Sequence, residues 1–178
     1  MKTSQTANWL VASFMLAAHI ASAETWYLKT ANNGGNLTTP SHWTNSVGTV
    51  ATAFSADDAY VVAPNKECKT PNSETTFAGG ELCLGTGGTY GQLNIYCTPL
   101  LFPLLTLDYG TLAMQGANGG AMSIDGEISV VGQYNVMRWL YSRQTMTLAA
   151  KLKGESTATL STNVRYANNG SRRVIKSA

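Results

Sequence analysis

The sequence is poor in charged side chains, and this shortage excludes some classes of partner. Charged residues make up 12% of the 178-residue chain, about half of the usual share of about 25%. Twelve basic and ten acidic side chains give a net charge of +2. Such a balance creates no strong electrostatic field that would attract nucleic acid or an anionic membrane surface.

Histidine is also scarce, and this argues against the common catalytic sites. Beyond an N-terminal apolar stretch, His42 is the single histidine of the chain. A Ser/His/Asp site would have to use it, and a zinc cluster needs several His or Cys ligands at suitable spacing. Because His42 directly precedes Trp43, we expect a structural role for it. The glycine-rich segment GTGGTYG at 85–91 lacks the Lys-Ser/Thr of a phosphate loop, so it predicts a turn between strands.

Three cysteines, Cys68, Cys83 and Cys97, are present without a C-x-x-C motif. The missing motif leaves no support for a thioredoxin-like redox role. In an oxidising compartment two of the three could pair, and the spacing selects none of the three possible pairings. Cys83 and Cys97 both lie in strand patterns, where at least one is expected to act as a small buried hydrophobic residue.

The N-terminus has the form of a secretory signal peptide. Lys2 is followed by a short apolar stretch, Trp9–Ile20, and then by Ala21-Ser-Ala23. A membrane-spanning helix needs roughly 20 apolar residues, so a membrane anchor is the weaker interpretation. We expect export to the periplasm, the outer surface or the medium, with cleavage after Ala23. The mature chain, Glu24–Ala178, is long enough for one domain with a sizeable core.

Short alternations of apolar and polar residues recur between Glu81 and Ser161. A spacing of two residues places apolar side chains on one face of a strand and Thr, Ser, Asn, Asp, Glu and Gln on the other. The segment therefore predicts β-structure with one buried and one solvated face. The expected inward residues are Leu82, Leu84, Leu93, Ile95, Cys97, Leu105, Leu107, Leu112, Met114, Met122, Ile124, Ile128, Val130, Met146, Leu148, Ala158 and Leu160.

Glycines punctuate these strands at Gly80, Gly110, Gly126 and Gly154, and the middle interval is much shorter than the outer two. A solenoid with loops of varying length would give this loose period. An antiparallel sandwich or jelly roll would also show many short strands between glycine turns. The glycines alone leave both architectures open.

The segment before the alternation differs in character. Turn residues surround Trp26 and Trp43, and the turn at Ala56-Asp-Asp58 is followed by a short strand that ends before Pro64. Residues 65–76 show no periodicity and predict a polar loop. The two tryptophans are expected to cover the end of the apolar core, although an exposed sugar-stacking platform is the alternative.

The order Trp26, Ser41-His-Trp43, Ala56-Asp-Asp58 and an apolar strand resembles the N-terminal start of exported bacterial autotransporter-associated β-strand-repeat proteins. Those proteins begin with W…NW…P…GD and a strand; here His42 replaces the asparagine, Ala56 replaces the glycine, and the proline is missing. The resemblance implies an all-β, short right-handed parallel β-helix (a β-solenoid) with an N-terminal cap, and it favours the solenoid over the sandwich.

We therefore divide the chain into four parts. These are a signal peptide (1–23), an N-terminal cap and loop (24–76), solenoid rungs (77–162), and an irregular tail or truncated continuation (163–178). The segment Pro99–Pro103 is expected to form a bulge or corner, because proline donates no hydrogen bond to a ladder. Residues 135–141 are expected to hold a helical turn or an inserted loop.

Two groups of side chains are candidates for chemistry or binding. Asp108, Asp125 and Glu127 lie on the polar phase, and Asp108 and Asp125 could share a proton or bind a cation if they stacked on adjacent coils. The aromatic and basic residues at 138–143 could contact a glycan, although a buried tryptophan beside a solvated arginine is the simpler reading. The members of this second group are Arg138, Trp139, Tyr141 and Arg143.

These observations assign no catalytic, cofactor-binding or metal-binding residue. We expect a non-catalytic, adhesin-like or structural passenger on the cell surface or outside the cell. Its expected partners are glycans or surface proteins, and another unit could stack on its C-terminal edge. A carbohydrate-active module, either a lyase or hydrolase fragment or a glycan-binding domain, is the alternative.

Overall fold

The computed structural model describes residues 23–29, 35–96, 99–115, 121–139, 145–164 and 173–176, and these residues form an all-β structure without an α-helix. The strands are β1 (Thr25–Leu28), β2 (Gly35–Asn36), β3 (Trp43–Thr44), β4 (Ala59–Val62), β5 (Lys66–Lys69), β6 (Thr75–Thr76), β7 (Glu81–Leu84), β8 (Gly91–Ile95), β9 (Leu100–Asp108), β10 (Gly110–Met114), β11 (Ala121–Val131), β12 (Asn135–Trp139), β13 (Thr145–Leu148), β14 (Lys151–Gly154), β15 (Leu160–Val164) and β16 (Arg173–Lys176). One 3-10 turn, η1, spans Pro40–His42.

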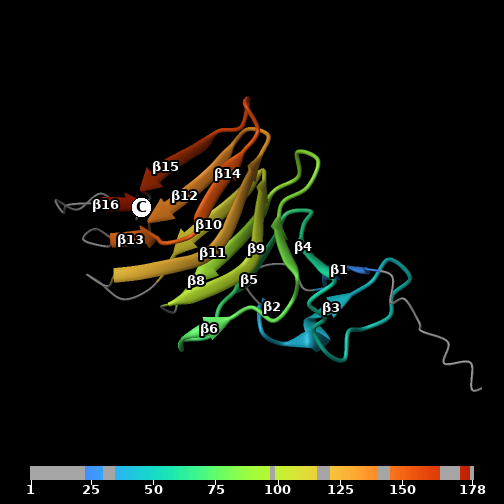
Figure 1. Cartoon of the computed structure of the whole chain (residues 1–178). Helices are drawn as coiled ribbons and strands as arrows, with labels where there is room; N and C mark the ends of the chain where they lie inside the picture. Colours follow the sequence, from blue (N-terminus) through green and yellow to red (C-terminus); the bar gives the residue numbers. More distant parts are fainter. Residues whose placement is uncertain are drawn as a thin grey trace, which may run out of the picture.

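The strands stack as the coils of a parallel β-solenoid (Figure 1). A six-stranded sheet has the order β15-β12-β10-β8-β5-β2, and a ten-stranded sheet contains the remaining strands. All described strand pairs are parallel except the pair of β1 and β3 at one end. The expectation of a solenoid is therefore confirmed, and the antiparallel sandwich is wrong.

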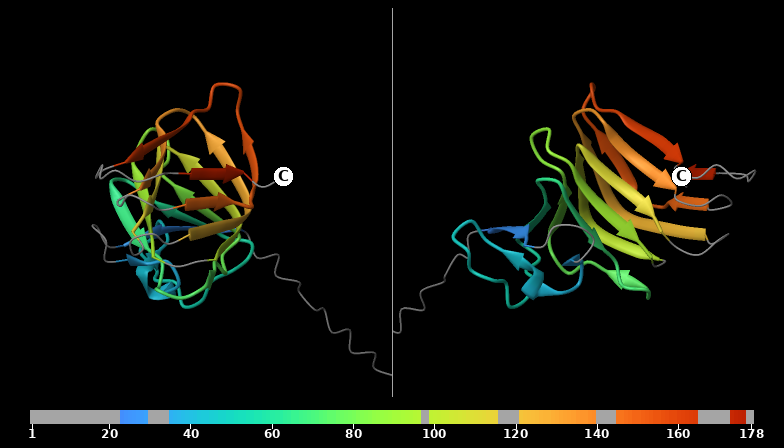
Figure 2. Two further views of the ribbon diagram at one scale, coloured as in Figure 1. Left: turned by 90° about the vertical axis from the view of Figure 1, so that its left-hand side faces the viewer. Right: turned by 180° about the vertical axis from the view of Figure 1, so that it is seen from behind.

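The ten-stranded sheet is bent, so each coil has three faces (Figure 2). The first part of β9 pairs with β6 and its last part pairs with β7. Likewise, β11 pairs with β13 through its first part and with β14 through its last part. Each of these two long strands thus turns a corner and continues into the next coil.

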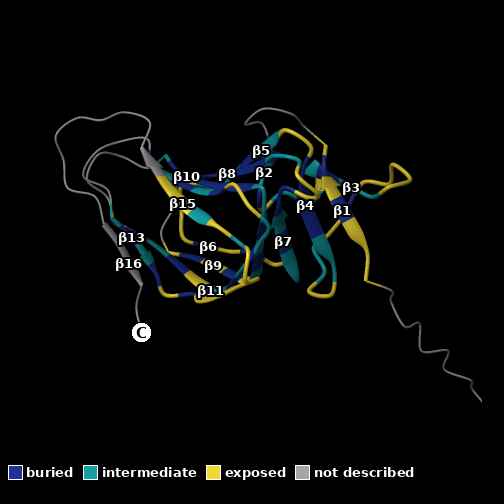
Figure 3. Ribbon diagram, turned by 90° about the horizontal axis from the view of Figure 1, so that it is seen from above, coloured by how far each residue is buried: buried dark blue, intermediate teal, exposed yellow. Residues whose placement is uncertain are grey.

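Apolar residues form files along the inside of the stack. Leu82 pairs with Leu105, and Leu105 pairs with Ile128, so the file runs at equal intervals along the chain. All three have 0% exposure. The expected inward residues are buried wherever the structure describes them, except that Ala158 and Leu160 are partly buried against the core (Figure 3). Cys97 lies outside the described residues.

The four glycines mark different positions in the coil, which explains their uneven spacing. Gly80 precedes β7, and Gly126 lies within β11 before the part that continues the β7 face. Gly110 instead begins β10 in the other sheet, and Gly154 is the last residue of β14. The short interval between Gly110 and Gly126 therefore runs from one face to another.

An aromatic cap covers the first coil. Strand β3 pairs antiparallel with β1 and contributes Trp43, which has 0% exposure. Its ring meets the ring of Tyr60 edge-on, with centroids 5.3 Å apart, and Tyr60 in turn contacts Phe54 and Phe77. Trp26 is also buried, with 9% exposure. The cap interpretation of both tryptophans is confirmed, and neither forms an exposed platform.

Three segments predicted to be irregular contain strands, and one of them is the tail at 163–178, where β16 pairs in parallel with β13. The expected loop at 65–76 contains β5 and β6, and Cys68 of β5 pairs with Leu93 and is fully buried. A single inward apolar residue is too short a pattern for an alternation to be visible. Residues 135–139 form β12 rather than a helical turn, with Asn135, Met137 and Trp139 buried.

Asn135 is polar and has 0% exposure, and its side chain is satisfied by the backbone around it. Its Oδ1 accepts a hydrogen bond from the Gly110 amide at 2.9 Å, and its Nδ2 donates to the Val131 carbonyl at 2.9 Å. Because both partners are present, the amide can be buried without an unpaired polar atom.

The expected bulge between Pro99 and Pro103 is confirmed. The register of β9 against β11 shifts between the pairs Phe102–Gly126 and Leu105–Ile128. Two residues of β9, one of them Pro103, therefore face one residue of β11. Proline has no amide hydrogen, so a position without a ladder hydrogen bond accepts it.

Candidate functional site

The outward side of the six-stranded sheet carries an ordered row of polar side chains. The register aligns Glu67 of β5 with Gln92 of β8, and it aligns Lys69 with Asn94. On β10, small residues, Thr111 and Ala113, take the corresponding places, and Arg138 of β12 pairs with Ala113. We refer to Glu67, Lys69, Gln92, Asn94, Gln115 and Arg138 as the polar face.

Hydrogen bonds join these side chains across four neighbouring strands, β5, β8, β10 and β12, with Gln115 directly after β10. Asn94 Nδ2 donates to Glu67 Oε2 at 3.1 Å, and Asn94 Oδ1 accepts from Gln92 Nε2 and from Gln115 Nε2, each at 2.7 Å. Arg138 Nη1 lies 3.5 Å from Gln92 Oε1. Gln92 and Asn94 are 4% and 1% exposed. A connected network of this kind holds its side chains in fixed positions.

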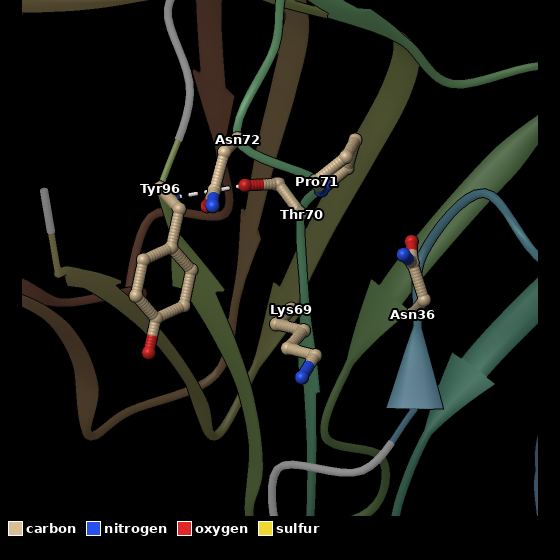
Figure 4. A pocket seen from close by; sticks show the side chains of 6 residues that line it. All are labelled: Asn36, Lys69, Thr70, Pro71, Asn72 and Tyr96. Atoms are coloured by element: carbon tan, nitrogen blue, oxygen red, sulfur yellow. Dashed lines mark hydrogen bonds between the residues drawn. The ribbon is translucent and has the colours of Figure 1, made fainter.

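An open groove of about 400 Å³ adjoins the polar face at the ends of β2, β5 and β8 (Figure 4). Lys69 lies along its middle, between Tyr96 and Asn36. The Tyr96 amide donates to Thr70 Oγ1 at 2.8 Å, and this hydrogen bond fixes the backbone of Tyr96. The lining residues are Asn36, Lys69, Thr70, Pro71, Asn72 and Tyr96.

The chemistry of the groove suits a hydroxylated ligand that carries negative charge. Its lining has one ammonium group, two carboxamides and a phenol, and none of the six lining residues is acidic. Within the described chain, Lys69 makes no ion pair. Carboxamides and a phenol can donate to and accept from hydroxyl groups, and the tyrosine ring offers an apolar surface. The volume is within the usual range of small-molecule sites, about 300–1,000 Å³.

The predicted carboxylate pair does not form. Asp108 pairs with Val131 in the ladder and Asp125 pairs with Leu101, so the two aspartates do not stack on adjacent coils. Asp108 Oδ2 accepts from the Gly87 amide at 2.6 Å, and Asp125 Oδ1 accepts from the adjacent Gly126 amide. Each carboxylate therefore has a local structural partner.

Glu127, the third carboxylate of that group, is an exposed member of an ion pair. Its Oε1 lies 2.5 Å from Lys153 Nζ on the neighbouring strand, and this hydrogen bond lowers the pKa of the glutamate. Within the described part of the chain, no three His, Cys, Asp or Glu side chains lie close enough to hold a metal ion.

His42 lies in the cap, where its Nδ1 accepts a hydrogen bond from the Asn36 amide at 2.8 Å. This contact helps to fix the short strand β2, which is the structural role expected for it. Of the predicted aromatic and basic group, Trp139 is buried and Arg138 is on the polar face. The simpler reading of these two is confirmed, and Tyr141 and Arg143 lie outside the described residues.

Cys68 and Cys83 are free thiols on opposite sides of the solenoid wall. Cys68 is buried in the six-stranded sheet, and Cys83 is on the outward phase of β7. Burial raises the pKa of Cys68, and burial together with the negative charge of Glu81 raises the pKa of Cys83 to about 12. Neither thiol is activated as a nucleophile, because a reactive cysteine needs a lowered pKa.

The sequence did not identify the groove. Asn36, Lys69 and Asn72 lie in segments that predicted turns or a loop, and Tyr96 follows directly after the inward Ile95. The alternation in residues 91–95 did indicate that Gln92 and Asn94 lie on the outward side of the strand, opposite Leu93 and Ile95. The missing signal was the register, which places β5 beside β8.

No protein-family model, curated protein or solved structure matches this chain. Across the part of the chain that the structure describes, there is no helix with the length and apolar character needed to cross a membrane.

Proposed function

We propose that this chain is a non-catalytic display segment, an adhesin-like or structural passenger that presents its polar face and groove to partners outside the cell. The observation that carries the proposal is the hydrogen-bonded polar face. Its two central side chains, Gln92 and Asn94, are buried and bond to the half-buried Glu67, Gln115 and Arg138 around them, and these half-buried groups are the ones that a partner can reach. A preorganised polar surface loses little conformational entropy when it binds a partner.

Export is part of this proposal. The order of charge, apolar stretch and Ala21-Ser-Ala23 supports a cleaved signal peptide. The layout of Trp26, Trp43 and Asp58 before a strand supports the resemblance to bacterial autotransporter-associated passengers. The proposal includes a bacterial origin, export, and a location in the periplasm, on the outer surface or outside the cell.

The proposal predicts that a variant of the polar face weakens attachment. The Arg138→Ala chain should bind about threefold or more weakly than the natural chain to those immobilised host glycans or matrix proteins that the natural chain captures. The reason is that Arg138 is a cationic donor on that face. Surface plasmon resonance at equal protein concentration measures the difference.

Lys151→Ala is the matched control, because Lys151 is exposed on β14 in the other sheet and its loss changes the net charge equally. A natural chain that captures no probe at high concentration would contradict the adhesin-like role. An equal loss in both variants would indicate a general charge effect rather than binding at the polar face.

A second candidate function is glycan binding, and the groove favours it. Its ammonium group, which makes no ion pair with a described residue, its two carboxamides and its tyrosine ring are groups that recognise an acidic sugar. We propose that a carboxylated oligosaccharide lies along the groove with a carboxylate at Lys69.

Lys69→Ala is expected to lower the affinity for an oligomer of galacturonic acid about three- to tenfold, which is modest because the groove is open to solvent. Isothermal titration calorimetry with the acid oligomer and with its methyl ester measures this effect. The neutral ester should bind both proteins equally, and Lys151→Ala should bind the acid like the natural chain. Equal affinity of the Lys69→Ala and natural chains for the acid oligomer would exclude this site.

A further inference from the structure

The backbone amide of Glu24 lies in an unusual position at the start of the first coil. It donates a hydrogen bond to Asp58 Oδ1 at 2.9 Å. The other oxygen of the same carboxylate, Oδ2, accepts from the Trp26 indole at 2.9 Å. Glu24 is the residue that follows the Ala21-Ser-Ala23 pattern, so its nitrogen is the atom that a signal peptidase would release.

Asp58 is well placed to hold that nitrogen. The turn before β4 positions it, because its own amide donates to the Ser55 carbonyl at 3.2 Å. The carbonyl of Glu24 accepts from the Ala59 amide at 2.9 Å, so the backbone of Glu24 is bound on both sides of its Cα atom. The carboxylate of Asp58 is half-buried and has no ion-pair partner among the described residues.

The surroundings also favour a positive charge at this point. A depression of about 280 Å³ beside the Glu24 nitrogen is lined by Glu24, Asp57, Asp58 and Glu81 and by no cationic side chain. Asn45 Nδ2 donates to Glu24 Oε1 at 2.6 Å, which holds the glutamate side chain at the rim. An ammonium group placed at this nitrogen would face only negative or neutral groups among the lining residues.

We propose that cleavage after Ala23 converts the Glu24 amide into the amino terminus of the mature protein, and that this ammonium forms an ion pair with Asp58. Water adds across the Ala23–Glu24 peptide bond, leaving a carboxylate on Ala23 and an amine on Glu24. The amine takes a proton from solvent at neutral pH. The hydrogen bond to Asp58 is kept and becomes charge-assisted, which makes it stronger than the amide bond that it replaces.

The consequence is that processing strengthens the cap. Among the described residues of the uncleaved chain, Asp58 accepts from neutral donors, the Glu24 amide and the Trp26 indole, whereas in the mature chain it has a counter-ion at the first residue of the fold. The position is specific: cleavage one residue earlier would move the ammonium by up to about 3.5 Å along the chain, out of hydrogen-bond contact with the carboxylate. The inference rests on the export part of the proposed function.

The test begins with the full-length chain expressed in a bacterial host that exports it. The intact mass of the exported protein is expected to correspond to the loss of residues 1–23. The melting temperature of this protein is then measured before and after selective acetylation of its α-amino group. Acetylation keeps the N–H donor and removes the charge, so it isolates the ion pair from the hydrogen bond.

We expect acetylation to increase the unfolding equilibrium constant up to about fivefold, which lowers the melting temperature by about 2–4 °C. In Asp58→Asn the same acetylation should have almost no effect, since the carboxylate is gone. Glu155→Gln is the matched control: it removes one exposed negative charge that does not line the depression at Glu24, and it should respond to acetylation like the natural chain.

Three results would overturn the pairing. The first is an intact mass showing that the mature chain begins at a residue other than Glu24. The second is a melting temperature of the natural chain that acetylation does not change. The third is an equal change of melting temperature in the natural and Asp58→Asn chains. Failure of export is distinguishable, because the protein would then keep its full mass inside the cell. A chain released at Glu24 by a site-specific protease would then be measured in the same way, and a response lost in Asp58→Asn would support the pairing itself.

Discussion

Replacement of Trp43 by alanine is expected to lower the free energy of unfolding by about 3–5 kcal/mol, the usual cost of deleting a large buried aromatic side chain. Trp43 has 0% exposure and packs edge-on against Tyr60. Its removal would leave a cavity between the cap and the first coil. Urea unfolding followed by circular dichroism measures the loss, with equal slopes in both proteins as the check that the same surface is exposed.

Trp43→Phe is the matched variant, and it should cost clearly less than the alanine change. The Trp43 indole Nε1 is buried and has no hydrogen-bond partner in the described structure. Phenylalanine therefore keeps much of the apolar volume and removes an unpaired polar atom, and that second effect offsets part of the loss. Two variants of equal stability, or an alanine variant as stable as the natural chain, would show that the cap does not close the core.

Replacement of Gly126 by alanine is expected to cost at least about 3 kcal/mol, because two effects act together. Gly126 has φ of +100°, a conformation that residues with a side chain rarely adopt. A Cβ atom added there would lie 1.7 Å from the Phe102 carbonyl oxygen on the neighbouring coil. The bulged pair of β9 and β11 would have to separate, and thermal unfolding of the variant measures the consequence.

Gly87→Ala separates the two effects. Gly87 also has positive φ, at +54°, but nothing lies within 4 Å of an added Cβ atom. Only the backbone strain remains, and we expect a loss of about 1 kcal/mol. If both variants lost the same stability, close contact at the bulge would not be what requires glycine at 126.

The inward files were predictable from sequence, because period two places Leu82, Leu105 and Ile128 on one face whatever the strands pair with. The same period could not decide between a solenoid and a sandwich. That choice depends on which strands are neighbours, and the parallel pairing of Leu105 with Ile128 joins residues that are distant in the sequence. Here the resemblance of the N-terminal segment favoured the parallel arrangement, which is the one observed.

Strands β5 and β12, which sequence missed, share one property: their inward positions are not a simple apolar series. Strand β5 has Cys68 as its single fully buried residue, and β12 begins with a buried Asn135. The groove was missed for a related reason. Lys69 and Tyr96 are far apart in the sequence, and the pairing of Lys69 with Asn94, two residues before Tyr96, brings them to one groove.

Asn135 also bears on how the coils find one another. Apolar files of similar side chains do not by themselves define one register between strands, because a slip of two residues would keep every strand's apolar side inward. The inward amide of Asn135 removes this ambiguity. Its Oδ1 accepts from the Gly110 amide of the neighbouring coil, whereas its Nδ2 donates to Val131 within its own coil. A stack slipped by two residues would move Oδ1 away from Gly110 and bury this oxygen unpaired. A single polar residue in an apolar file thus specifies the register of neighbouring coils, as a buried asparagine does in a coiled coil.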